Sequence, residues 1–203
     1  MWAAVGPRRG GGIAARALGL ARGGRLLFSD LSFAAAPGAF IEVRGPNGAG
    51  KTSLLRALAG FLRVDVGAVE IDAEAPAQAL HYLGHRDGLK PALTARAHAR
   101  YWAGLLGGEG AGAEAALARV GLSSLADAPA RIFSQGQARR LALARLLAAP
   151  RPLWLLDEPA AGLDAAGKAL LAGLIEAHCA AGGVAVAALH EPLGPPPTQA
   201  ISL

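Results

Sequence analysis

The sequence predicts an α/β protein organised around a phosphate-binding loop, with an antiparallel β subdomain and an inserted helical subdomain. The first observation is the pattern G-x-x-x-x-G-K-[ST] at residues 45–52, between an expected strand and an expected helix. The second is a group of short segments with alternating apolar residues on either side of this pattern, which is typical of antiparallel strands. The third is a helical stretch that precedes a buried strand ending in two acids.

Length and composition allow one domain at residues 13–203, with a helical subdomain at about residues 88–135 and a loose segment at residues 1–12. The formal net charge of +5 comes from arginines scattered along the chain rather than from a basic block. We therefore interpret it as a general compositional bias and expect no nucleic-acid partner. No apolar run approaches the roughly 18 residues of a membrane span. The single cysteine, Cys179, rules out an internal disulfide and fits a reducing compartment.

The phosphate-binding loop consists of Gly45, Pro46, Asn47, Gly48, Ala49, Gly50, Lys51 and Thr52, and Ser53 follows it. Glycines allow successive backbone N–H groups to turn inward around an anion, at the positive end of a helix dipole. In this motif Lys51 reaches the β- and γ-phosphates, and the hydroxyl of Thr52 binds Mg²⁺. A glycine-rich turn that only joins two elements is the alternative, and the flanking strand and helix favour the phosphate site.

Short apolar segments predict the β structure. Residues 17–20 and 26–27 are apolar pieces on either side of an expected hairpin turn at residues 22–25. Several antiparallel strands near the strand of the loop suggest a mixed sheet. The other expected strands are residues 30–36, 40–44, 64–72, 79–85, 152–158 and 184–189, followed by an irregular C-terminal tail.

Helices are expected at residues 51–62, twice within 90–120, at 134–149 and at 165–181. Ser134 is a good N-cap for the fourth of these helices. Arg139, Arg140 and Arg145 are expected to mark its polar side, while Leu143 and Leu147 pair at i, i+4.

Two acids, Asp157 and Glu158, follow four apolar residues of an expected buried strand. Ligands of open α/β sheets bind beyond the carboxyl ends of the strands. If this strand lies beside the strand of the loop, Asp157 holds Mg²⁺ directly or through water, and Glu158 orients and polarises an attacking water. A pair of solvated acids that begins a turn at Pro159 is the alternative, which the phosphate loop disfavours.

The order of these motifs resembles that of the nucleotide-binding domains of ATP-binding-cassette (ABC) transporters, from Ile13 onward. The resemblance implies the ABC ATPase fold, Mg²⁺-dependent ATP hydrolysis, and two copies of the domain that enclose two ATP molecules. The motifs are the phosphate loop, Phe133-Ser134-Gln135-Gly136-Gln137, Leu155-Leu156-Asp157-Glu158-Pro159, Gly162-Leu163-Asp164 and His190.

The family's site roles are carried over to the matching positions. The resemblance implies catalytic roles for Lys51, Glu158 and His190, and His190 is implied to contact the γ-phosphate. Asp164 corresponds to the loop that passes information across the dimer. A signature run is implied to approach the γ-phosphate of the ATP held by the second copy; it comprises Ser134, Gln135, Gly136 and Gln137.

Three positions depart from the family pattern. Gln135 replaces the usual second-position glycine of the signature run, which we expect to be tolerated if its side chain points outward. His85 stands where the family usually has a glutamine that senses Mg²⁺ and couples to the membrane subunits. Arg22 stands where an aromatic residue often stacks on adenine, and an arginine plane also stacks on a base.

Residues 82–94 carry a narrower resemblance, to the ATP-binding proteins of the haem exporter in cytochrome c biogenesis. Gly84-His85 in place of the common Pro-Gln pair is its main feature, and Ala97-His98-Ala99 departs from it. This resemblance implies peripheral attachment to the cytoplasmic face of the bacterial inner membrane. The implied partners are a CcmB-like permease and a haem-handling subunit, although no haem site is evident in the sequence.

Three alternatives remain open from the sequence. The first is the ATPase subunit of another small ABC transporter, which only the stretch around His85 separates from the haem exporter. The second is a non-transport cassette protein acting on DNA or ribosomes, which the single cassette and the absence of a heptad run disfavour. The third is a nucleotide-binding scaffold that hardly hydrolyses, which Glu158 and His190 disfavour.

Overall fold

The computed structural model describes residues 11–107 and 110–203, and its chain divides into two compact units. Unit 1 comprises Met1–Tyr82, Arg151–Glu158 and Leu174–Leu203, and unit 2 comprises Leu83–Pro150 and Pro159–Gly173. The loose segment predicted at residues 1–12 lies outside the described residues except for its last two glycines. Within the described ranges, no helix combines the length and apolar character that crossing a membrane requires.

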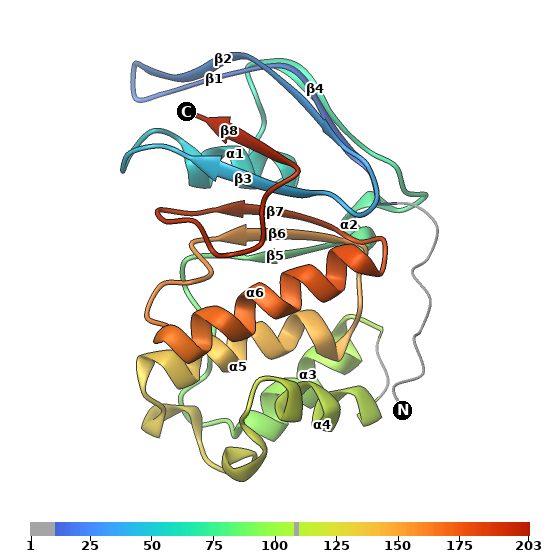
Figure 1. Cartoon of the computed structure of the whole chain (residues 1–203), viewed down its shortest axis with the longest axis vertical. Helices are drawn as coiled ribbons and strands as arrows, with labels where there is room; N and C mark the ends of the chain where they lie inside the picture. Colours follow the sequence, from blue (N-terminus) through green and yellow to red (C-terminus); the bar gives the residue numbers. More distant parts are fainter. Residues whose placement is uncertain (1–10, 108–109) are drawn as a thin grey trace. The chain divides into compact units, whose positions relative to one another are not determined.

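A three-stranded antiparallel sheet in unit 1 has the order β2-β1-β4 (Figure 1). Its strands are β1 (Ile13–Arg22), β2 (Arg25–Ala35) and β4 (Val66–Ile71). The predicted hairpin turn is confirmed, since Arg22 pairs with Arg25 around Gly23 and Gly24, which both have positive φ. The separate apolar pieces expected after the turn form one strand, because pairing with β1 continues as far as Ala35.

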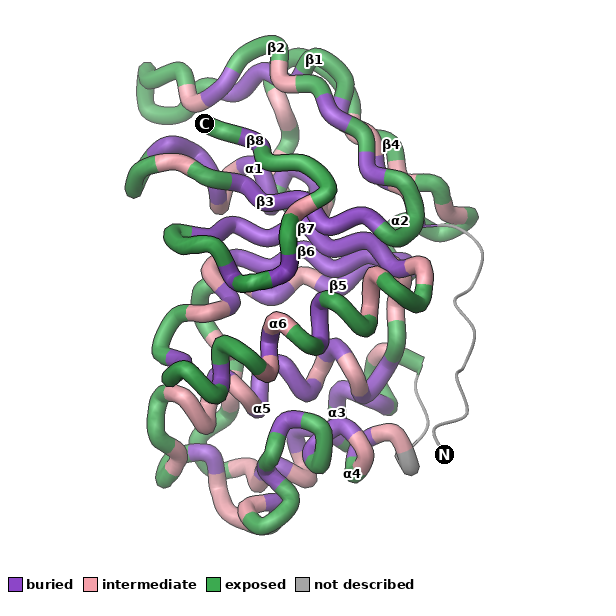
Figure 2. Tube along the Cα trace, in the orientation of Figure 1, coloured by how far each residue is buried: buried purple, intermediate pink, exposed green. Residues whose placement is uncertain are grey.

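The strand that precedes the phosphate loop belongs to a second sheet, of order β5-β6-β7-β3-β8, rather than to one mixed sheet. Its pairs β3–β7, β3–β8 and β6–β7 are parallel. Figure 2 shows β3, β6 and β7 buried along almost their whole length. The strands are β3 (Phe40–Arg44), β5 (Leu80–Leu83), β6 (Leu153–Asp157), β7 (Val184–Ala188) and β8 (Gln199–Ser202).

Two expectations for this sheet are wrong. The C-terminal tail is not irregular throughout, because Gln199–Ser202 pairs with β3 as strand β8. Such a short, mostly exposed strand has no local pattern of its own, and its partner strand determines it. The strand that ends in the two acids is also not beside the strand of the loop, since β7 lies between β6 and β3.

Helix α1 (Lys51–Leu58) follows the phosphate loop and packs into a core shared by both sheets of unit 1. Leu54, Leu55 and Leu58 are fully buried in this core. The helix ends earlier than predicted, because Gly60 adopts a left-handed conformation just after it. A short helix, α2 (Pro76–Ala79), precedes β5.

Unit 2 is helical. It contains α3 (Ala95–Leu105), α4 (Gly110–Arg119), two 3-10 turns at Ser123–Leu125 and Ala130–Ile132, and α5 (Gln135–Ala148). Helix α6 (Ala165–Ala180) begins in unit 2 and ends in unit 1. His98, in the run that departs from the haem-exporter pattern, is buried and accepts a hydrogen bond from the Lys90 backbone N at 2.9 Å. This residue therefore attaches the segment before α3 to the helix itself.

The predicted polar side of α5 is wrong. Arg139 is only 2% exposed, and Arg140 and Arg145 are half-buried rather than exposed. The charge of the three arginines predicts contact with solvent, but the sequence carries no information about which neighbours the fold places against them. In the fold these neighbours are an acid, backbone carbonyls and an aromatic ring.

Candidate functional site

The phosphate loop joins β3 to α1 with backbone conformations that favour glycine. Gly45 has φ +151°, and a Cβ there would lie 2.8 Å from the carbonyl oxygen of Leu203. Gly50, the N-cap of α1, has φ +111°, and its Cβ would lie 3.1 Å from Cβ of Leu27. These positions require glycine for both conformation and space. The N–H groups that follow Gly50 belong to the first turn of α1, where an anion is favoured.

Lys51 lies over this loop with its side chain bent back along it. Its Nζ donates to the carbonyl oxygen of Gly45 at 2.7 Å and to that of Pro46 at 3.1 Å. The residue is only 6% exposed, so its charge is held close to the loop. An ammonium has three N–H donors, so these two bonds leave one donor for a phosphate oxygen.

Thr52 in α1 and Asp157 at the end of β6 are in contact, although β7 lies between β6 and β3, the strand that precedes the loop. The Thr52 hydroxyl donates to Oδ1 of Asp157 at 3.0 Å. Contact is possible because α1 crosses the sheet beyond the end of β3, where it packs against both β6 and β7. Asp157 is 1% exposed and lies at the carboxyl end of β6. The condition that β6 lies beside β3 is therefore not met, and α1 rather than strand adjacency brings Thr52 to Asp157.

The Thr52–Asp157 pair has the donor chemistry that Mg²⁺ prefers. Both side chains offer hard oxygen ligands, and Mg²⁺ is usually held by one or two carboxylates together with substrate phosphates and water. No cluster of three or more His, Cys, Asp or Glu side chains suited to a metal occurs in residues 11–107 and 110–203. The pair therefore fits a metal that is bound with a phosphate ligand.

Tyr82 is a site neighbour that the sequence reasoning missed. Its hydroxyl lies 3.5 Å from Oδ2 of Asp157. Its ring packs edge to face against Phe61, with the two ring centroids 5.4 Å apart. Burial is the largest cause that raises the pKa of the Tyr82 hydroxyl, which keeps it protonated. An aromatic residue within an apolar strand gives no sequence signal for this position.

Glu158 and His190 form a pair at the carboxyl ends of β6 and β7. Nε2 of His190 lies 2.8 Å from Oε1 of Glu158, and both side chains are partly exposed. Glu158 has φ +50°, an uncommon value for a residue other than glycine, and its N–H donates to Ala188 O at 3.1 Å. Strained conformations of this kind cluster at functional sites. The turn at Glu158 sends its side chain toward His190 just beyond the buried strand.

The signature run forms the N-terminus of α5 in unit 2. The Ser134 side chain accepts from the Gln137 backbone N at 3.2 Å, and Gln137 Oε1 accepts from the Ser134 backbone N at 2.9 Å. This capping box confirms Ser134 as the predicted N-cap. The hydroxyl oxygen of Ser134 acts as an acceptor in the box, so its own hydrogen remains a donor for an anion.

The signature run packs against the run that contains Asp164, also in unit 2. A Cβ at Gly136 would lie 3.1 Å from the Gly162 carbonyl oxygen, and one at Gly162 would lie 2.8 Å from Cγ of Gln135. Gln135 is exposed, and its side chain extends over Gly162. Asp164 accepts the Gly167 N–H at 2.7 Å at the start of α6, as an N-cap does.

Two further predicted positions, Arg22 and His85, are both exposed. Arg22 lies at the end of β1, opposite Arg25 across the hairpin turn. His85 follows β5 in unit 2. Within unit 1 the fold therefore brings the phosphate loop, the two acids and His190 to the carboxyl edge of the parallel sheet, and within unit 2 it joins the signature run to the run of Asp164.

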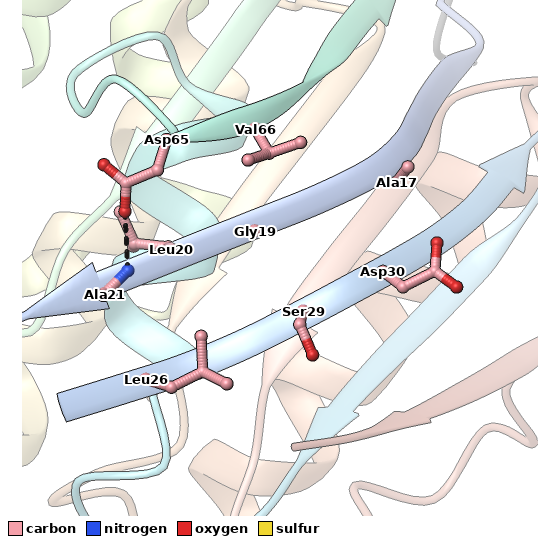
Figure 3. Close-up of a pocket in the computed structure, with 9 residues that line it drawn as sticks. All are labelled: Ala17, Gly19, Leu20, Ala21, Leu26, Ser29, Asp30, Asp65 and Val66. Carbon is pink, nitrogen blue, oxygen red and sulfur yellow. Dashed lines mark hydrogen bonds between the residues drawn. The ribbon is translucent and has the colours of Figure 1, made fainter.

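A surface hollow of about 390 Å³ lies elsewhere, on the antiparallel sheet of unit 1 (Figure 3). Leu26 and Val66 lie on its apolar wall, and the side chain of Asp65 accepts the Ala21 N–H at 2.7 Å. None of the predicted site residues lines this hollow.

Comparison with known proteins agrees with this geometry. A family model of ABC transporters matches residues 28–161. The cytochrome c biogenesis ATP-binding export protein CcmA of Nitrobacter winogradskyi is 51% identical over 177 residues, covering 85% of this chain and 88% of that protein. The CcmA of Rhodopseudomonas palustris (strain BisB18) is 52% identical over 183 residues, covering 88% and 92%.

Solved structures share the fold at lower identity. A Pyrococcus furiosus protein assigned to the ABC transporter ATP-binding proteins superposes with a TM-score of 0.83 at 20% identity, over 95% of this chain and 97% of that one. An ATP-binding subunit of another ABC transporter gives a TM-score of 0.75 at 23% identity, over 87% and 79%. At such identities the likeness concerns the fold alone. From the family match and the relatives at about 50% identity, the chain belongs to the ABC transporter ATPases and, within them, to the CcmA family of cytochrome c biogenesis ATP-binding export proteins.

Proposed function

We propose that this chain is the ATP-hydrolysing subunit of the haem exporter of cytochrome c biogenesis. The observation that carries the ATPase part is the joint position of Thr52, Asp157, Glu158 and His190 at one edge of the parallel sheet of unit 1. The name shared by the CcmA relatives supports an export role in cytochrome c biogenesis. Haem as the cargo follows from the narrower resemblance around His85.

ATP binding in this proposal uses the loop backbone and Lys51. The amide groups at the start of α1 surround the phosphates, and the Lys51 ammonium donates to the β- and γ-phosphate oxygens. Lys51 already lies over the loop with one N–H donor left for a phosphate oxygen, so contact with a second phosphate requires the exchange of only one carbonyl partner. Arg22, near the hairpin turn, is the residue proposed to stack on the base.

Thr52 and Asp157 are the residues that would hold Mg²⁺ with the phosphates. A bound Mg²⁺ neutralises charge that develops on the phosphate oxygens during transfer. Asp157 is buried and bonded to Thr52 at 3.0 Å, so both oxygens are positioned by the protein rather than by the nucleotide. Such preorganisation is the main source of electrostatic catalysis.

Glu158 is the proposed general base. Its carboxylate accepts a proton from a water molecule as the water oxygen attacks the γ-phosphorus, and the bond to the β–γ bridging oxygen breaks to release ADP and phosphate. The contact with His190 at 2.8 Å holds the carboxylate in one orientation. His190 is also the residue proposed to contact the γ-phosphate from the neighbouring strand end.

A second copy of the chain is proposed to complete the site. The signature run of Ser134, Gln135, Gly136 and Gln137 offers a hydroxyl and helix N-terminal amides, which suit the γ-phosphate of the other copy's ATP. Asp164 and His85 are proposed to take part in communication across the dimer and toward the membrane subunits. The partners are a CcmB-like permease and a haem-handling subunit, at the cytoplasmic face of the bacterial inner membrane.

Co-purification tests the assignment of the transporter. The full chain, expressed with a tag in a bacterium that makes c-type cytochromes, is expected to recover a CcmB-like permease from detergent-solubilised membranes. A Lys51→Ala chain serves as the control for nucleotide dependence of that recovery. Recovery with an unrelated permease, and without the CcmB-like one, would replace the haem exporter by another small ABC transporter.

A further inference from the structure

Arg139 is a buried cation in α5 that the proposed chemistry does not use. Its Nε donates to the carbonyl oxygen of Pro159 at 3.0 Å. Its Nη1 donates to the carbonyl oxygen of Gly84 at 3.1 Å and to Oδ1 of Asp87 at 2.8 Å. All four residues belong to unit 2. One guanidinium therefore holds two segments that are far apart in the sequence onto the first turns of α5.

These contacts require the shape of an arginine. Burying a charge is costly unless it is paired and hydrogen-bonded, and the Arg139 side chain is only 3% exposed. The guanidinium is a planar fork whose donors point in different directions, whereas a lysine ammonium is a compact point charge. The Nε and Nη1 donors of Arg139 reach Pro159 on one side and Gly84 with Asp87 on the other.

Asp87 also lies in the field of a second arginine. Burial lowers the pKa of Arg145, the nearby charge of Arg139 lowers it further, and Asp87 acts in the opposite direction. Arg145 stands over the Trp102 ring of α3, with its guanidinium carbon 5.9 Å from the ring centroid. The carboxylate of Asp87 thus lies near the charges of two arginines on α5, and its direct bond to Arg139 attaches its segment to this helix.

The two segments held by Arg139 adjoin residues of the proposed site. Pro159 directly follows Glu158, and Gly84 directly precedes His85. The helix that carries Arg139 begins right after Ser134, the N-cap of the signature run. Glu158, His85 and the signature run are therefore each linked to the side chain of Arg139 through the adjoining backbone or through helix α5.

We propose that Arg139 is a positioning residue that holds the peptide after Glu158 and the segment of His85 against α5. The rate of ATP hydrolysis then depends on the separate Nε and Nη1 donors of its guanidinium, whereas ATP binding does not. The inference rests on the proposed role of Glu158. The phosphate loop and Lys51 lie in unit 1, and Lys51 bonds to the loop itself, so the affinity for ATP provides an internal reference. Misplacement of a reacting group by about 1 Å is enough to lower a rate by roughly 100-fold.

Two substitutions of Arg139 separate the effect of its guanidinium geometry from the effect of its positive charge. Arg139→Lys keeps a cation for Asp87 but cannot also supply the Nε bond to Pro159, and Arg139→Gln removes the charge. We expect kcat for ATP hydrolysis by the full chain to fall about 10-fold or more in Arg139→Lys and further in Arg139→Gln, with KM and the Kd for ATP within about twofold of wild type. Arg96→Gln is the matched control, since Arg96 pairs with Asp127 at 2.8 Å in the same unit without touching either held segment.

Backbone hydrogen exchange gives a readout that does not use activity. In Arg139→Lys, exchange is expected to rise in residues 160–164 and to stay near wild type in residues 84–90, because the charge pair with Asp87 persists. In Arg139→Gln both segments are expected to exchange faster. Asp87→Asn is expected to raise exchange in residues 84–90 alone, and adding it to Arg139→Gln should lower kcat by less than the two separate effects predict.

The results separate three situations. Wild-type kcat and exchange in Arg139→Lys would overturn the proposal, since the charge alone would then suffice. A uniform loss of thermal stability with faster exchange throughout unit 2 in both variants would also overturn it, by assigning Arg139 a general structural role. If Glu158→Gln retains full activity while the exchange pattern is as expected, the role of Glu158 fails and the link made by Arg139 stands.

Discussion

The phosphate loop of unit 1 and the start of α5 in unit 2 both present backbone N–H groups at the first turn of a helix, but they are built differently. The loop is stabilised by near neighbours, because Lys51 bonds to Gly45 and Pro46 only a few residues before it. The start of α5 has a local capping box, yet its buried charge is neutralised by segments far away in the sequence. A contiguous motif can specify chemistry, whereas the positioning of separate segments depends on tertiary contacts.

This difference leads us to expect two kinds of defect. Changes in the side chains at the edge of the parallel sheet should remove chemistry or binding and leave the fold intact, because these groups are partly exposed or bonded to the loop. Changes in side chains that join distant segments should alter stability or positioning.

The largest effect is expected for Glu158→Gln. Loss of a general base lowers a rate by about 10²- to 10⁴-fold, and the amide is nearly isosteric with the carboxylate, so ATP should still bind. Steady-state ATPase assays and fluorescent-nucleotide titration measure the two quantities, and Glu74→Gln, an exposed acid between β4 and α2, is the control. Activity close to that of wild type would show that Glu158 is not the base.

His178 should give unit 1 a stability that is lost in acid. Its ring stacks on Trp154 at 3.8 Å, and Nε2 lies 3.1 Å from Pro152 O and 3.2 Å from Val184 O, so the neutral ring donates there. Burial lowers the pKa of His178 to about 4. The unfolded chain therefore takes up the proton first, and stability is lost as the pH falls from about 6.5 to about 4.

The size of this effect follows from the shift. A decrease of about 2.5 pKa units corresponds to about 3 kcal/mol of unfolding free energy, fully present at neutral pH. Urea unfolding at a series of pH values measures it, and His178→Phe should flatten the dependence between pH 6.5 and 4. An equally steep loss of stability in that variant would assign the acid sensitivity to other groups.

Lys51→Ala should weaken nucleotide binding rather than stability. A hydrogen bond from a charged group contributes about 1.5–3 kcal/mol, so the Kd for ATP should rise by roughly 10- to 100-fold. Isothermal titration measures the affinity, with Lys90→Ala as a control because its side chain is exposed. Retained affinity in Lys51→Ala would contradict the assignment of the loop as the phosphate site.

Ser134→Ala tests the local part of the α5 start and should give the smallest effect. Loss of an N-cap costs about 1 kcal/mol, so the midpoint of thermal unfolding should decrease by a few degrees. Ser134→Asp should restore the cap, since aspartate accepts the same backbone bond, while its charge opposes an incoming phosphate. A variant in which the cap is restored and activity remains low would separate capping from the proposed phosphate contact.

Much of the site was predictable because its signals are local. The glycines, Lys51 and Thr52 form one continuous run, and the two acids directly follow an apolar strand. The contact between Thr52 and Asp157 does not arise from neighbouring strands, since β7 lies between β6 and β3. Helix α1 brings Thr52 to the end of β6 instead. The proximity of Tyr82 to Asp157 had no signal, because an aromatic residue in a strand is ordinarily part of the core.

The sequence alone predicted the strand and helix that flank the glycine loop, the hairpin at Gly23 and the N-cap of α5. Each depends on backbone conformations and hydrogen bonds within a few residues, which the residue types themselves favour. Only the tertiary structure decided that Gln199–Ser202 forms a strand and that Arg139 is buried. Both depend on partners that are distant in the chain, and helical spacing or local composition carries no information about which partners the fold supplies.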